Sequence, residues 1–316
     1  MRLATLFCVA ACSNAGVPHD APVEVAGWAN RASTTGVLPF NDTELDTYFL
    51  DISFTDPSVL VRELGNEEFV AVNLLVFKED SGLDGLSGRE AYAVYTSMNV
   101  TTQQDLGSRS ILNADIEVQA VGSSSPEFQA LRLIEYDNRA DFGTFSVTIP
   151  DEGRDARAAG LVGQWLLPAH TLSEDRRPRG RNVDCGSWTP QSAAEATGLS
   201  LHQAQDILDQ PSTEPVLIFE LIAIGSATGD FDAYSDALAL VQDELGARRR
   251  WEGELIRPLI GDADPTFEQA RVTDYPSPDC AIATLADPRV TRQDTNRVTG
   301  SEVYWLYAAT RTPRSF

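Results

Sequence analysis

The stretch LGSRSILNADIEVQAVGSSSPEFQALRLIEY (Leu106–Tyr136) returns later in the chain as LGARRRWEGELIRPLIGDADPTFEQARVTDY (Leu245–Tyr275). The two segments align without a gap at a constant offset of 139, the difference between 245 and 106. A fixed period that preserves Gly, Pro and apolar positions together indicates an internal duplication. The identical pairs are Leu106/Leu245, Gly107/Gly246, Arg109/Arg248, Gly122/Gly261, Pro126/Pro265, Phe128/Phe267, Arg132/Arg271 and Tyr136/Tyr275, and the pair Glu135/Asp274 keeps the carboxylate.

Each copy lies within the same succession of predicted elements. An apolar strand is followed by an amphipathic helix, an antiparallel strand pair formed by the duplicated segment, a short helix and a last strand. In the first copy the predicted strands are 69–78, 110–121, 128–136 and 159–169, and the predicted helices are 89–104 and 138–145. The second copy has a predicted strand at 214–224, a helix at 230–245 capped by Asp230, the second hairpin, a helix from Ser277 and a strand at 300–309. The last strands match at offset 140 in Gly160/Gly300, Trp165/Trp305, Leu166/Leu306 and Ala169/Ala309.

This order predicts an α+β fold made of two ferredoxin-like βαββαβ repeats. A single repeat covers only one face of its sheet with helices, so the other face needs a partner. We therefore expect the two sheets to pack face to face within one chain as a pseudo-dimeric α+β barrel, and the protein to be a monomer. The predicted segments are a leader (1–12), a tether and irregular lead-in (13–66), repeat one (67–170), a linker with a helix (171–212) and repeat two (213–311).

Several short motifs carry a family resemblance. They are an opening strand with Asn73 and Lys78, a Tyr-bearing helix, a Gly-Ser/Ala-Arg step, and a strand that ends in an acidic residue and Tyr. The chain thereby resembles the family called "domain of unknown function thirteen-thirty", within the dimeric α+β barrel superfamily. The two repeats depart from each other, because Glu220 stands in repeat two where Asn73 stands in repeat one.

Composition narrows the function classes. The formal net charge of −23 argues against nucleic acid, whose recognition rests on basic patches. The first residues, MRLATLFCVAAC, resemble a signal peptide with a lipobox that ends at Cys12. We expect lipidation at Cys12, a place in the bacterial cell envelope on the outer-membrane or periplasmic side, and membrane attachment through this anchor only. If the lipobox is not used, we expect secretion.

Two cysteines follow the leader. In an oxidising envelope Cys185 and Cys280 could form one disulfide between the linker and repeat two, or they could be two separate thiols. The sequence contains no nucleophile elbow, phosphate loop, dinucleotide fingerprint or Cys-x-x-Cys pair. The three histidines, His19, His170 and His202, lie outside the predicted central strands. We therefore expect neither a metal nor a cofactor.

The candidate site residues are polar side chains at corresponding places of both repeats. They have two interpretations: cross-strand ion pairs with a Tyr hydroxyl fixing the strand end, or a ligand pocket in each repeat between sheet and helices. Trp165 and Trp305 are likewise either core residues or a stacking surface for an aromatic ligand. The pocket candidates are Asn73, Tyr92, Arg109, Arg132, Glu135, Tyr136, Glu220, Tyr234, Arg248, Arg271, Asp274 and Tyr275.

Two functional hypotheses remain open. The first is an envelope lipoprotein whose barrel binds a small hydrophobic ligand or a protein partner. The second is a cofactor-independent enzyme of the monooxygenase or isomerase type, acting on a small aromatic or polyketide-like substrate, as the superfamily resemblance implies. The absence of histidines from the predicted central strands and the difference between Asn73 and Glu220 favour the first.

Overall fold

The computed structural model describes residue 64 and residues 67–175, 183–211, 215–261 and 265–312. The predicted leader, the lipidation residue Cys12 and all of the predicted tether except Leu64 lie outside the described residues. We call residues 67–175 the first half and residues 215–312 the second half. The segment between them, residues 183–211, is called the linker.

Strands and helices alternate through both halves. In chain order they are β1 (Phe69–Phe77), α4 (Gly88–Asp105), β2 (Arg109–Val121), β3 (Ala130–Tyr136), α5 (Arg139–Thr148), α6 (Asp151–Gly160), β4 (Leu161–Glu174), α7 (Pro190–Thr197), α8 (Leu201–Leu208), β5 (Val216–Ile224), α9 (Thr228–Glu244), β6 (Arg248–Leu255), β7 (Gln269–Tyr275), α10 (Pro278–Ala286), α11 (Pro288–Thr291), α12 (Asp294–Gly300) and β8 (Ser301–Arg311).

The strands form one closed antiparallel barrel in the order β1-β3-β2-β8-β5-β7-β6-β4. Each half contributes four adjacent strands, and the halves join where β2 pairs with β8 and β4 pairs with β6. The expected barrel is present, and the inner faces of the two four-stranded halves share one core. The two sheets are not separate, however, because they are hydrogen-bonded edge to edge. Closure in this way leaves no barrel strand with unpaired backbone groups along an open edge.

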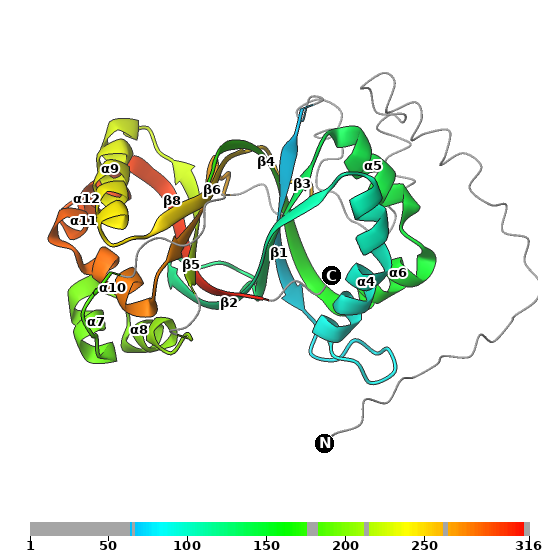
Figure 1. Cartoon of the computed structure of the whole chain (residues 1–316), viewed down its shortest axis with the longest axis horizontal. Coiled ribbons are helices and arrows are strands. Elements are labelled where there is room, and N and C mark those ends of the chain that lie inside the picture. The colour runs from blue at the N-terminus through cyan, green and yellow to red at the C-terminus, as the bar shows by residue number, and fades with distance from the viewer. Residues whose placement is uncertain (1–63, 65–66, 176–182, 212–214, 262–264, 313–316) are drawn as a thin grey trace, which may run out of the picture.

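The alternation of side chains along each strand separates an inner core from two outer cores. On β1, Val70, Val72 and Leu74 belong to the apolar cluster inside the barrel, while Ala71 and Leu75 pack against helices. Figure 1 shows α4, α5 and α6 on one side of the barrel and α9 to α12 on the opposite side. Asn73 lies on the helix-facing side of β1, where the site described below is found.

Trp165 and Trp305 belong to the core inside the barrel, with ring centroids 5.6 Å apart. Each indole packs against a glycine of the other half of the chain. A Cβ atom at Gly122 would overlap Trp305, and one at Gly261 would overlap Trp165. Both glycines also have positive φ angles, +82° and +112°, which favour glycine. The duplicated Gly and Trp positions are thus explained by packing across the two halves.

Three local predictions differ from the structure. Helix α6 was not predicted, although its residues complete the helical cover of the first half. The linker sequence that we expected to form one helix forms two, α7 and α8, because Gly198 ends α7 in the left-handed region with φ 76°. Asp230 does not cap α9: the cap position is Ala227, and the Asp230 carboxylate accepts from the Thr299 hydroxyl instead.

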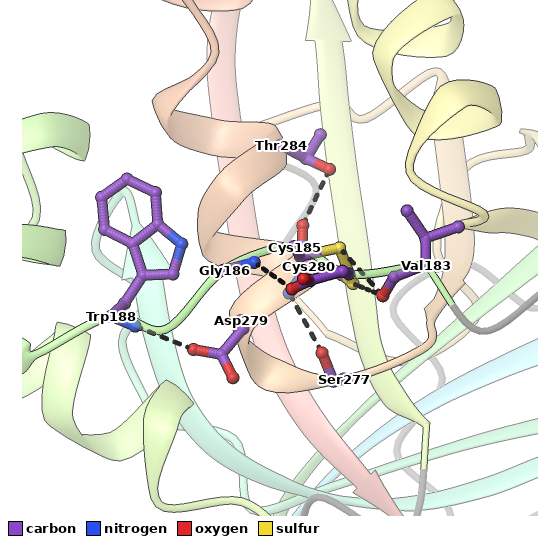
Figure 2. Close-up of a disulfide and its surroundings, with 9 residues drawn as sticks. Val183, Cys185, Gly186, Trp188, Ser277, Asp279, Cys280 and Thr284 are labelled. Atoms are coloured by element: carbon purple, nitrogen blue, oxygen red, sulfur yellow. Dashed lines mark hydrogen bonds between the residues drawn. A yellow bond between two sulfur atoms is a disulfide. The ribbon is translucent and has the colours of Figure 1, made fainter.

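A disulfide joins the linker to the second half. Cys185 lies before α7, and Cys280 lies in the first turn of α10. Figure 2 shows the bond together with the hydrogen bond from the Trp188 backbone amide to the Asp279 carboxylate, 3.0 Å long. The linker therefore has two attachments to the start of α10. Among the described helices, none combines the length and the apolar character needed to cross a membrane.

Candidate functional site

A cavity of about 50 Å³ lies in the first half, between the outer face of the sheet and helices α4, α5 and α6. Four of the predicted pocket residues line it: Asn73, Tyr92, Arg132 and Tyr136. Strand periodicity explains the placement, because Asn73 on β1 and Arg132 on β3 are cross-strand partners and point to the same face. Tyr92 reaches the cavity from α4. We call this space the sheet–helix cavity.

One wall of the cavity is a chain of amide and guanidinium groups. The Gln164 Nε2 atom donates to Asn73 Oδ1 at 2.6 Å, and Gln164 Oε1 accepts from the Arg157 guanidinium. Arg157, on α6, is only 7% exposed. Gln164 thereby fixes the orientation of both neighbours, and its own donor and acceptor are used in doing so.

Positive charge is not balanced within this cavity. The Arg132 guanidinium lies over the Tyr92 ring, 4.6 Å from its centroid, and Arg132 is paired across the strands with Asn113. Neither Arg132 nor Arg157 forms an ion pair with any described residue, and no Asp or Glu is among the described residues that line the cavity. In a chain with a net charge of −23, two arginines in one cavity with no carboxylate partner in the described ranges form a distinct electrostatic feature.

Tyr136 closes the cavity near the end of β3. Its hydroxyl accepts from Gln103 Nε2 at 3.4 Å, and its ring stacks on Phe69 with centroids 5.5 Å apart. Burial raises the pKa of the Tyr136 phenol well above its ordinary value. The phenol is therefore neutral at physiological pH and can offer its O–H proton to an acceptor, but it does not act as a base.

The second half has the corresponding arginines, and both are paired with acids. Glu252 stands where the first half has Asn113, and Arg271 Nε donates to Glu252 Oε1 at 2.7 Å. Arg297 corresponds to Arg157 at offset 140, and its Nε donates to Asp294 Oδ1 at 2.8 Å. The duplication thus supplies an internal comparison, in which the same two cations are neutralised in one half only.

Of the pocket residues predicted for the second half, Tyr234 lines a cavity of about 520 Å³, which is described below. Tyr304 occupies the strand position of Gln164, and its hydroxyl donates to the carboxylate of Glu220. The Tyr234 hydroxyl lies 3.5 Å from that of Tyr304. Glu220, Tyr304 and Tyr234 thus form a buried polar cluster beside that cavity, where the first half has the Asn73–Gln164 hydrogen bond. Tyr275, at the strand end, accepts from Gln242 at 2.8 Å.

The remaining predicted residues form ion pairs away from the sheet–helix cavity. Arg109 makes a two-pronged contact with Glu135, at 2.7 and 2.6 Å, and also contacts Glu174. In the second half, Asp274 pairs with Arg250 and with Arg311 rather than with Arg248. Arg248 itself lies 3.9 Å from Asp175. For Arg109, Glu135, Arg248 and Asp274 the ion-pair interpretation therefore describes the geometry.

Sequence reasoning missed Asn113, Arg157 and Gln164. The signal for Asn113 was available, because the gapless alignment places it opposite Glu252 and so exposes a loss of charge next to a retained arginine. Arg157 matches Arg297 at the offset of the last strand, but α6 was not predicted. Within the described part of the chain, no group of three or more His, Cys, Asp or Glu side chains is placed to hold a metal ion.

No family model matches the sequence, and no curated protein matches it, so membership of the domain-of-unknown-function family is not confirmed. Solved structures do match. A protein of unknown function from Rhodopseudomonas palustris is 16% identical, with 46% of this chain and 100% of that chain covered and a TM-score of 0.32. An anthrone oxidase-like protein is 10% identical, with coverages of 78% and 92% and a TM-score of 0.41.

Chlorite dismutase from Candidatus Nitrospira defluvii is 8% identical, with 81% of this chain and 94% of that chain covered and a TM-score of 0.44. The fold described here rests on this chain's own strand pairing.

Proposed function

We propose that the protein is a binding protein whose sheet–helix cavity takes a small organic anion, such as a carboxylate. The observation that supports this most directly is that two arginines differ from their counterparts in having no acidic partner. Arg132 and Arg157 have no carboxylate partner among the residues that the structure describes, whereas their counterparts Arg271 and Arg297 are each paired with an acid. Removing a guanidinium from water without a counter-ion is costly, and a bound anion would supply that counter-ion.

The size and lining of the cavity narrow the ligand class. A volume of about 50 Å³ accommodates a few water molecules or a compact anion, since one water needs roughly 10 to 15 Å³ by this measure. Typical drug-sized pockets enclose about 300 to 1,000 Å³. Tyr92, Tyr95 and Phe142 give the cavity aromatic walls that suit a planar group. These properties favour a small planar carboxylate over the small hydrophobic ligand expected from the sequence.

The enzymatic alternative would need a group that moves a proton near neutral pH. Efficient general acid–base catalysis calls for a pKa near the working pH. The ionisable side chains that line the cavity are arginines and tyrosines, and burial raises the pKa of Tyr136 further from neutrality. We therefore favour binding over a cofactor-independent monooxygenase or isomerase reaction in this cavity.

Calorimetric titration with sodium acetate, pyruvate and benzoate, each against its neutral amide at constant ionic strength, tests the proposal. We expect saturable binding of at least one acid and none of its amide. The decisive variant is Asn113→Glu, which gives Arg132 the partner that Arg271 already has. It should weaken binding at least tenfold while the chain stays folded. Arg289→Gln, which removes a charge from an exposed surface pair, is the matched control and should bind as the original chain does.

Equal binding by the Asn113→Glu variant and the original chain would refute the assignment, as would equal binding of acids and amides. The variant mimics an arrangement that this fold already contains in Glu252 and Arg271. Loss of binding through unfolding is therefore separable from loss through neutralisation, because circular dichroism of the variant reports the former directly.

We also infer the evolutionary origin, the oligomeric state and the cellular location of the protein. The constant offset and the four-strand contribution of each half support an origin by duplication of a ferredoxin-like unit. Closure of the barrel within one chain supports a monomer. Lipid attachment at Cys12 and a place in the cell envelope remain predictions from the sequence, and the intact mass of the protein extracted from its own membranes tests them.

A further inference from the structure

A second and larger cavity, of about 520 Å³, lies between the linker and the second half. Its walls come from the end of β2, from α7 and α8, and from α10, α11 and α12. Figure 1 shows α7 and α8 beside α10. We call it the linker cavity, and we propose that it binds a neutral, mainly apolar molecule that carries one hydrogen-bond donor. This inference is independent of the anion site proposed for the first half.

The walls of the linker cavity carry no unbalanced charge. Val121, Leu199 and Leu306 are among its apolar residues. The charged residues that line it are Arg297 and Asp294, and they form an ion pair with each other at 2.7 Å. A charged ligand would therefore find no free counter-ion among the described lining residues. The volume falls in the range of about 300 to 1,000 Å³ typical of small-molecule sites.

The polar end of the cavity accepts hydrogen bonds. Tyr234 and Tyr304 line it, and the single hydroxyl proton of Tyr304 is donated to Glu220. The Tyr304 oxygen is thus left with acceptor capacity only. Its contact with Tyr234, at 3.5 Å, is longer than a usual hydrogen bond between hydroxyls. A ligand O–H or N–H group can occupy this acceptor.

Glu220 strengthens the preference for a donor. Its side chain is 1% exposed, and Oε2 has no hydrogen-bond partner among the described residues. A buried carboxylate with an unpaired oxygen polarises the Tyr304 hydroxyl and makes its oxygen a better acceptor. The Glu220 carboxylate therefore does not contact the proposed ligand directly, because the Tyr304 hydroxyl lies between them.

The linker wall is fixed in place before any ligand binds. The disulfide between Cys185 and Cys280 holds the segment that enters α7, as Figure 2 shows, and the Trp188 amide donates to Asp279. On the other side, Gln203 Nε2 donates to the backbone oxygen of Gln119 at 2.9 Å. A preorganised wall reduces the entropy lost on binding. The affinity of the linker cavity should therefore depend on the disulfide.

Fluorescence titration with N-phenyl-1-naphthylamine tests the proposal, because this probe is neutral, apolar and has one N–H donor. We expect saturable binding of one equivalent to the full chain. Ala196→Trp places a ring in the cavity from α7 and should weaken binding at least tenfold. Gln191→Trp, an exposed position on the same helix outside the cavity, is the matched control and should change binding less than twofold.

Two further variants give independent readings. The double substitution Cys185→Ser and Cys280→Ser should weaken probe binding severalfold, whereas Asn113→Glu in the sheet–helix cavity should leave it unchanged. Absence of saturable probe binding, or equal effects of Ala196→Trp and Gln191→Trp, would overturn the linker-cavity assignment. Neither outcome bears on carboxylate binding by the first half, so the two proposals succeed or fail separately.

Discussion

The Arg271 guanidinium on β7 donates a hydrogen bond of 2.7 Å to the Glu252 carboxylate on the neighbouring strand β6. Arg132, in the corresponding place of the first half, lies opposite Asn113 in the strand register instead. The backbone around the two arginines is equivalent, since β2 pairs with β3 as β6 pairs with β7. A single change from acid to amide therefore separates a neutral structural pair from a cationic cavity. The duplicated fold provides the scaffold, and the cross-strand partner decides what the arginine does.

Replacement of Glu252 should destabilise the second half. Arg271 is 5% exposed, and Glu252→Asn leaves its guanidinium buried with a weaker partner. Breaking a buried pair on one side costs on the order of 3 kcal/mol in the free energy of unfolding. Urea denaturation measures this loss. Arg289→Gln, at an exposed pair, should cost far less, and equal losses in the two variants would contradict the burial argument.

Gly122 should not tolerate a side chain. A Cβ atom there overlaps Trp305, and the backbone has φ +82°. Gly122→Ala should therefore lower the free energy of unfolding by about 2 to 4 kcal/mol, the combined cost of overpacking and of a left-handed backbone. Gly82 has a similar φ of +72° with open space around it. Gly82→Ala isolates the backbone part, and thermal unfolding of both variants should show the larger drop for Gly122.

Loss of the disulfide should lower stability substantially. The bond closes a loop of 95 residues in sequence separation, and cross-links of that length stabilise by about 4 to 5 kcal/mol in the chain-entropy description. The double substitution Cys185→Ser and Cys280→Ser should reduce the denaturation midpoint accordingly. The original chain treated with a reductant is the matching control. A midpoint that is insensitive to both treatments would show that the linker is held by its other contacts.

Alkaline pH should unfold the protein through its buried tyrosines. Burial raises the pKa of Tyr234 from 10.0 to about 12, and the pKa values of Tyr136, Tyr275 and Tyr304 are raised as well. Between pH 10 and 12 the unfolded phenol ionises while the folded one stays protonated, so stability falls as pH rises through this window. Each pKa unit corresponds to about 1.4 kcal/mol.

Phenolate absorbance during an alkaline titration measures this effect. The absorbance of the buried tyrosines should rise together with the loss of circular dichroism rather than before it. Tyr234→Phe removes one of the linked phenols and should make the dependence of stability on pH shallower above pH 10. A smooth titration of all tyrosines near pH 10 in the folded protein would contradict the burial assigned to them.

The sequence by itself predicted the internal repeat, the order of the strands and most of the helices, and which neighbouring side chains of a strand share a face, such as Arg132 and Ile134. It could do so because side-chain alternation and a gapless repeat are local properties of the chain. The tertiary structure decided how the two sheets join, since edge pairing of β2 with β8 and of β4 with β6 links residues far apart in sequence.

The tertiary structure also decided which groups surround the cavity in each half. Gln164 and Tyr304 occupy corresponding strand positions, and the sequence shows both, but only three-dimensional packing reveals that Gln164 bonds to Asn73 and Arg157 whereas Tyr304 bonds to Glu220. Charge is partly different: the repeat alignment already shows Asn113 in place of Glu252, but only the strand pairing shows that these residues lie opposite Arg132 and Arg271. The volume and the electrostatic balance of a site depend on every group around it. The local sequence pattern therefore predicts where a residue lies on its strand, whereas its role follows from the assembled fold.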